Sequence, residues 1–162
     1  MAELTRVFVY GTLKQGFPNH KLLSKLSKSQ IVKFISNAET VEKYPLVTAT
    51  QAGIPFLLDY AGRGKHILGE VYEVCDHTLA NLDDLEDEGV LYDRKKIQVA
   101  LTDSNFNQQH IDAFAYVITN GNSNLLNFEF LSNFTHEIAK HYCPKTDRTI
   151  IYQDILKEVK GQ

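Results

Sequence analysis

Seven short runs rich in Val, Ile, Phe and Tyr fill most of residues 5–118, and they limit the possible folds more than any other feature. Short alternating or continuous apolar runs are typical of β-strands. We predict strands at residues 6–10, 30–41, 45–48, 56–59, 67–74, 94–101 and 111–118. Because the expected helices lie apart from these strands, the pattern predicts an α+β fold. Its core would be a small, mainly antiparallel β-barrel, closed or half-closed, with flanking helices.

Helices are expected around this strand-rich part of the chain. Asn19 is a good N-cap and predicts a short helix after it. Asp76 is expected to cap a second helix, and Gly89 to end that helix in the left-handed conformation. The apolar spacing becomes helical after Leu125, and a final helix is predicted over residues 150–159.

The chain is expected to form one domain. Its 162 residues suit a single hydrophobic core, and no linker or repeat divides them. We therefore assign residues 1–162 to one domain with a helical C-terminal segment around residues 125–160.

The charge balance and cysteine content exclude several function classes. Seventeen Lys and Arg oppose twenty Asp and Glu, so the net charge is −3 and no nucleic-acid partner is expected. No apolar stretch approaches the ~20 residues that cross a bilayer, so no membrane association is expected. Residues 1–6 lack a signal-peptide pattern, and Cys75 and Cys143 are expected to be free thiols in the reducing cytoplasm.

One acid in the segment 76–89 stands in an unusual position for a charged residue. At about 100° per residue, Leu79, Leu82 and Leu85 form an apolar stripe on a helix, and Glu86 projects between them. A carboxylate on an apolar face is unfavourable unless it is paired or hydrogen-bonded. In a pocket, however, desolvation raises its pKa and makes it a better base near neutral pH.

A structural role for Glu86 stays open beside the catalytic one. In that alternative the side chain lies in solvent at the helix end, or it pairs with Arg94, because structural ion pairs also explain inward acids.

The turn after the first predicted strand, Tyr10-Gly11-Thr12-Leu13, is a candidate binding loop. Gly11 allows a ligand to approach the main chain closely. Successive N–H groups after a strand can form an anion-binding nest, and Thr12 adds a hydroxyl. The same pattern is equally typical of a plain turn.

No metal or cofactor site is expected. His136 and His141 resemble the histidine pair of a zinc-protease helix, but their spacing places them about 140° apart on a helix.

Several ordered motifs together resemble one known family, the γ-glutamylcyclotransferase-like family. Within it, they are most similar to the branch of γ-glutamylamine cyclotransferase and the plant avirulence-induced proteins. The motifs lie within residues 7–94 and are Val9-Tyr10-Gly11-Thr12-Leu13-Lys14, Tyr44-Pro45-Leu46-Val47, Ile54-Pro55-Phe56-Leu57-Leu58, Gly69-Glu70-Val71-Tyr72 and Leu82-Asp83-Asp84-Leu85-Glu86.

This resemblance implies a γ-glutamylcyclotransferase-like barrel with a cofactor-free active site. It implies that the turn formed by Tyr10, Gly11, Thr12 and Leu13 binds the γ-glutamyl group, and that Glu86 is the catalytic acid and base. Tyr92 matches a recurrent tyrosine near the family's pocket. The alternative for this residue is a ring that only packs in the core.

The implied activity is that of a cytoplasmic γ-glutamylamine cyclotransferase, a lyase-type intramolecular aminoacyl transfer. It would convert small γ-glutamyl amines, with γ-glutamyl-ε-lysine favoured, to 5-oxoproline and the free amine. Glutathione and γ-glutamyl amino acids stay possible substrates. Two alternatives from other classes are a non-catalytic ligand-binding or regulatory module with the same pocket, and a protein that binds a partner through its C-terminal segment.

Overall fold

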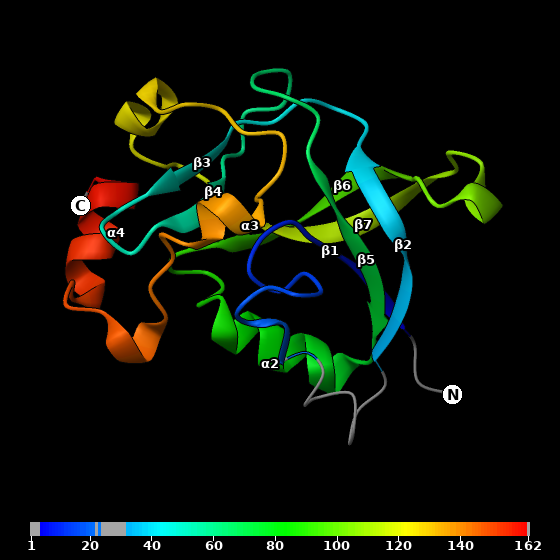
Figure 1. Ribbon diagram of the computed structural model, residues 1–162, viewed down its shortest axis with the longest axis horizontal. Coiled ribbons are helices and arrows are strands. Elements are labelled where there is room, and N and C mark those ends of the chain that lie inside the picture. The colour runs from blue at the N-terminus through cyan, green and yellow to red at the C-terminus, as the bar shows by residue number, and fades with distance from the viewer. Residues whose placement is uncertain (1–3, 22, 24–31, 162) are drawn as a thin grey trace.

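A computed structural model describes residues 4–21, 23 and 32–161, and its centre is a closed β-barrel (Figure 1). Neighbouring strands of the barrel pair antiparallel, except where β1 and β7 run parallel and close it. The prediction of a small, mainly antiparallel barrel with flanking helices is therefore confirmed. In barrel order the strands are β1 (Thr5–Val9), β5 (Leu68–Val74), β2 (Val32–Thr40), β6 (Asp93–Leu101) and β7 (His110–Val117).

The alternation of buried and exposed side chains explains why β6 forms a strand of the barrel. Ile97, Val99 and Leu101 are buried, whereas the alternate residues Lys96 and Gln98 are exposed. This period of two is the pattern of a strand with one face on the core and one in solvent.

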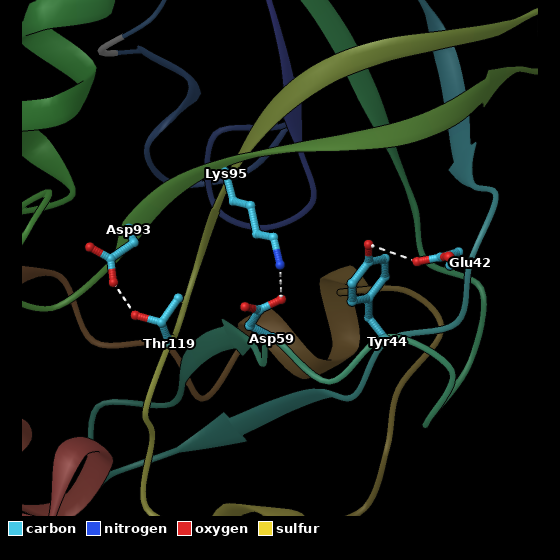
Figure 2. Close-up of polar contacts among 6 residues, drawn as sticks. All are labelled: Glu42, Tyr44, Asp59, Asp93, Lys95 and Thr119. Atoms are coloured by element: carbon cyan, nitrogen blue, oxygen red, sulfur yellow. Dashed lines mark hydrogen bonds and ion pairs between the residues drawn. The ribbon is translucent and has the colours of Figure 1, made fainter.

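Two of the predicted strands lie outside the barrel. β3 (Leu46–Ala49) and β4 (Ile54–Leu57) pair with each other in a separate two-stranded sheet. β4 ends earlier than predicted because the main chain of Asp59 instead donates to Ile118, next to β7. The Asp59 side chain also accepts a hydrogen bond from Lys95 of β6 at 2.6 Å, which ties this hairpin to the barrel (Figure 2).

Helix α2 (Asp76–Leu85) follows β5, and both of its ends differ from the predicted ones. Cys75 occupies the N-cap position, so Asp76 is the first helical residue and not the cap. The helix ends before Gly89, which does adopt a left-handed conformation, but Asp87 has already turned left-handed with a φ of 52°. The earlier end leaves Glu86 at the C-cap, where the chain leaves the helix.

The C-terminal part is less helical than its apolar spacing predicts. Leu131 pairs with Leu46 in an isolated β-bridge, so the segment after Leu125 is mostly loop. Ile155 and Val159 of the last helix pack in the same apolar cluster as residues of β1. The elements outside the strands are η1 (Ser104–Phe106), η2 (Ser123–Asn127), α3 (His136–Ala139), η3 (Lys145–Asp147) and α4 (Tyr152–Lys160).

Two further predictions can be compared with the structure only within the residues that it describes. The helix predicted after Asn19 falls largely on residues 22 and 24–31, which lie outside them. No helix within the described ranges is long and apolar enough to span a membrane. The assignment of residues 1–162 to one domain stays a prediction.

Candidate active site

A pocket of about 280 Å³ lies between the turn after β1, the end of α2 and the C-terminal segment. The structure brings all the sequence-predicted site residues to its wall, although they are far apart in the chain. They are Tyr10, Gly11, Thr12, Leu13, Glu86 and Tyr92.

Glu86, at the C-cap of α2, lines this pocket. Its side chain is partly buried, and its N–H donates to the Leu82 carbonyl at 2.9 Å, which completes the last helical turn. Burial raises the pKa of Glu86 to about 7, against the opposing charge of Lys145. The carboxyl group can therefore both accept and donate a proton near neutral pH.

The predicted alternative of a Glu86–Arg94 ion pair is wrong. Arg94 pairs with Asp83 at 3.1 Å, and the hydroxyl of Tyr116 donates to the other oxygen of Asp83 at 2.8 Å. No side chain of the described residues donates a hydrogen bond to the Glu86 carboxylate. Its acid–base capacity is thus not used in a structural pair with any described residue.

Two buried tyrosines stand beside Glu86. The hydroxyl of Tyr10 donates to the Tyr116 carbonyl at 2.6 Å, and that of Tyr92 donates to the Pro55 carbonyl at 2.9 Å. Burial, reinforced by the charge of Glu86, raises the pKa of both phenols, so they stay neutral. Both hydroxyl groups donate their protons to main-chain carbonyls, so these tyrosines shape the pocket and have no hydroxyl proton left to donate to a ligand.

The turn at residues 10–13 presents main-chain N–H groups at the pocket wall. The N–H groups of Gly11, Thr12 and Leu13 donate to no acceptor among the residues that the structure describes. The side chain of Asn19 donates to the Thr12 hydroxyl oxygen at 2.9 Å, which leaves the hydroxyl proton of Thr12 available. An anionic ligand group could accept from these donors.

Gly11 is required here by close packing. A Cβ atom at this position would lie 2.8 Å from Cγ of Pro55, whose carbonyl accepts the hydrogen bond of Tyr92. The absence of a side chain therefore lets the turn lie directly against the β3–β4 sheet.

Hydrogen bonds to distant parts of the chain hold Lys14 and Gln15, the two residues just after this turn. Lys14 is buried, and its ammonium group donates to Asn133 Oδ1 at 2.7 Å and to the Phe134 carbonyl at 2.9 Å. The N–H of Gln15 donates to the buried Glu70 carboxylate at 3.0 Å. Burial lowers the pKa of Lys14 to about 8, against the opposing effect of Glu70. These contacts fix the turn against the rest of the fold.

Sequence reasoning misses a third wall of the pocket. This C-terminal wall, residues 142–152, contributes Tyr142, Lys145, Arg148 and Tyr152 to the lining. The hydroxyl of Tyr142 accepts a hydrogen bond from the Asn19 side chain at 3.0 Å, so the wall is joined to the 10–13 turn through Asn19. No motif marks these residues, because only the packing of α4 on the barrel brings them to the pocket.

The histidines near the C-terminus do not form a metal site with each other. α3 ends at Ala139, before His141, and the His136 ring stacks on Phe17 at a centroid distance of 4.2 Å. Across the described residues, no group of three or more His, Cys, Asp or Glu side chains could hold a metal ion.

Comparisons with known proteins agree with this architecture. The profile of the family described as gamma-glutamyl cyclotransferase, AIG2-like, matches residues 7–132. The Drosophila melanogaster protein CG2811, provisionally named a gamma-glutamylcyclotransferase, is 42% identical over 151 residues, which are 93% of each chain. The gamma-glutamylaminecyclotransferase of Bos taurus is 46% identical over 99 residues, 61% of this chain and 58% of the bovine one.

A solved structure is similar over almost the whole fold. The crystal structure of an AIG2-like protein from Mus musculus superposes with a TM-score of 0.82 at 33% identity, covering 90% of this chain and 99% of the mouse chain. By sequence and by fold, this chain belongs to the AIG2-like γ-glutamylcyclotransferase family.

Proposed function

We propose that this protein is a γ-glutamylamine cyclotransferase that converts small γ-glutamyl amines to 5-oxoproline and a free amine. Family membership supports the reaction type, and the name of the bovine relative supports amines as the leaving groups. The observation that carries the proposal is the placement of Glu86, with a pKa raised to about 7, in one pocket with the 10–13 turn. γ-Glutamyl-ε-lysine is the favoured substrate.

The reaction is intramolecular. The α-amine of the substrate attacks its own γ-carbonyl carbon, a five-membered ring closes, and the bond from that carbon to the leaving nitrogen breaks. Glu86 takes a proton from the attacking amine and returns it to the leaving nitrogen, which is a poor leaving group while unprotonated. Such general acid–base assistance typically contributes about 10²–10⁴-fold.

The pocket walls serve this reaction by orientation and charge. The N–H groups of the 10–13 turn bind the substrate carboxylate or stabilise negative charge that develops on the γ-carbonyl oxygen. The buried rings of Tyr10 and Tyr92 hold the flexible glutamyl chain folded, and orientation of this kind lowers a barrier by several kcal/mol. No cofactor takes part in these steps.

The direct test is a panel of γ-glutamyl-ε-lysine, γ-glutamyl α-amino acids and glutathione, with 5-oxoproline measured by mass spectrometry. Production of 5-oxoproline from γ-glutamyl-ε-lysine, above that from the other two classes, supports the proposal. Thermal stabilisation by these compounds without product would instead indicate a ligand-binding module. We also place the protein in the cytoplasm, since Cys75 and Cys143 form no disulfide among the described residues, as is usual in a reducing compartment.

A further inference from the structure

The mouth of the pocket is formed mainly by the C-terminal wall. Most of the pocket lining is buried or partly buried, and the lining residues that are exposed mark the opening. They are Lys21, Pro144, Lys145 and Tyr152, three of which belong to residues 142–152. This wall lies beyond residue 132, where the match to the family model ends.

The wall brings two cations to the pocket without carboxylate partners. Lys145 donates to the Leu85 carbonyl at 3.2 Å, and Arg148 donates from Nε to the Cys143 carbonyl at 2.8 Å. Nη2 of Arg148 donates to the Tyr142 hydroxyl at 3.3 Å. Within the described part of the chain, neither cation forms an ion pair, and Nη1 of Arg148 donates to no acceptor.

Cations outnumber acids among the described residues of the lining: Lys21, Lys145 and Arg148 stand against Glu86 and Asp87. Asp87 accepts a hydrogen bond from the Tyr152 hydroxyl. Glu86 is required as the proton carrier if the proposed function is correct, so it must alternate between its charged and neutral forms. The mouth therefore keeps an excess of positive charge that a substrate can satisfy.

We propose that Arg148, assisted by Lys145, selects γ-glutamyl substrates whose leaving amine carries a carboxylate. This inference rests on the proposed function, which places the γ-glutamyl group at Glu86 and the 10–13 turn. The leaving amine then extends toward the mouth, where the guanidinium group donates to its carboxylate. Hydrogen bonds between charged partners are about twice as strong as neutral ones, so a single carboxylate gives useful discrimination. Amines without a carboxylate, such as diamines, gain nothing from these cations and are repelled by them.

The test compares two substrates that differ by one carboxylate. γ-Glutamyl-ε-lysine and γ-glutamylcadaverine present the same chain and the same terminal amine, and only the first carries the acid group. We expect kcat/KM to be about tenfold higher for the lysine compound. In Arg148→Gln the ratio should fall toward one, mainly through KM, and in Lys145→Gln it should fall part of the way. Lys157→Gln, an exposed lysine of α4 outside the pocket, is the matched control and should keep the ratio.

Each outcome separates this inference from the proposed function. If the wild-type protein releases 5-oxoproline equally well from both compounds, the specificity inference is wrong while the proposed function stands. If Arg148→Gln loses activity equally on both, Arg148 binds the shared γ-glutamyl part, and the inference is again overturned. If neither compound yields product, the proposed function and the inference both fail. If Arg148→Gln does not fold, the ratio of kcat/KM for the two compounds in the wild-type protein and in Lys145→Gln still tests the inference.

Discussion

Arg94 donates to Asp83 at 3.1 Å, and this pair determines which acid at the end of α2 remains available for chemistry. Asp83 is held further by the Tyr116 hydroxyl, so it acts as a structural acceptor. Glu86, three residues later, lines the pocket and receives no hydrogen bond from any described side chain. Neighbouring acids of one short segment thus have different environments, and burial in that of Glu86 raises the pKa of its carboxyl group toward neutrality.

The substitution Glu86→Gln should remove turnover without loss of the fold. The amide occupies the same space, but it can neither take the proton of the attacking amine nor return one. We expect kcat to fall by about 10²–10⁴-fold, with a much smaller change in affinity for 5-oxoproline. The matched control is Asp84→Asn, an exposed acid of the same helix, which should keep wild-type activity. Full activity of Glu86→Gln would remove this residue from the mechanism.

The same substitution should stabilise the protein above neutral pH. The carboxyl group loses its proton near pH 4.5 when unfolded and near pH 7 when folded. The folded state therefore binds more protons between these values, and stability falls as the pH rises through this window. Glu86→Gln abolishes this dependence and should gain at most about 3 kcal/mol at pH 8, less where solvent reaches the group. Thermal unfolding at pH 5 and pH 8 measures it, and equal melting temperatures of both proteins at pH 8 would contradict it.

The pH dependence of the reaction should shift when Lys145 is replaced. Because Glu86 accepts a proton only in its charged form, kcat/KM should rise as the pH rises through about 7. The charge of Lys145 lowers the pKa of Glu86, so Lys145→Gln should move this acid limb to higher pH. A profile of kcat/KM between pH 5 and pH 9 tests both statements, with Lys157→Gln as control. An unchanged limb in Lys145→Gln would show that the two charges do not interact.

The barrel could be predicted because its signal is local. In β6, for example, Ile97, Val99 and Leu101 alternate in the sequence with polar or small residues, and all three are buried. The separation of β3 and β4 from the barrel could not be predicted in this way. Which strands pair depends on contacts such as the Asp59–Ile118 hydrogen bond between distant segments, and no period within a strand encodes them.

The candidate site was predictable on two of its three sides. Helical spacing places Glu86 on the apolar side of α2, and the glycine at position 11 marks the turn. Lys145 begins η3, which has only three residues, and Arg148 directly follows it. So short an element gives no periodicity that indicates where these side chains point. The position of these two residues at the pocket depends on α4, which follows them in the chain. Ile155 of this helix is buried against the barrel and so fixes where the preceding residues lie.

Replacing Gly11 with Ala should disturb the turn more than the rest of the fold. The new Cβ would lie 2.8 Å from Cγ of Pro55, so the turn must move away from the β3–β4 sheet. A displacement of this kind, within about 1 Å, is expected to lower kcat/KM by up to about 10²-fold. The double variant Gly11→Ala/Pro55→Ala removes the clashing atom and should recover part of the activity. If the double variant is no more active than Gly11→Ala, this contact is not the cause.

The last helix should prove to be part of the core and not a surface for a partner. Ile155 is 2% exposed and packs in the main apolar cluster, so Ile155→Ala should lower the free energy of unfolding by about 2–5 kcal/mol. Ile151, at the start of the same helix, is 61% exposed, and Ile151→Ala should change stability by less than about 0.5 kcal/mol. Deletion of residues 144–162 removes both the buried contacts and the mouth of the pocket, so it should unfold the protein or abolish turnover. Denaturant titration with a 5-oxoproline assay measures these effects. A deletion variant that keeps its stability and its activity would instead favour a partner-binding role for this segment.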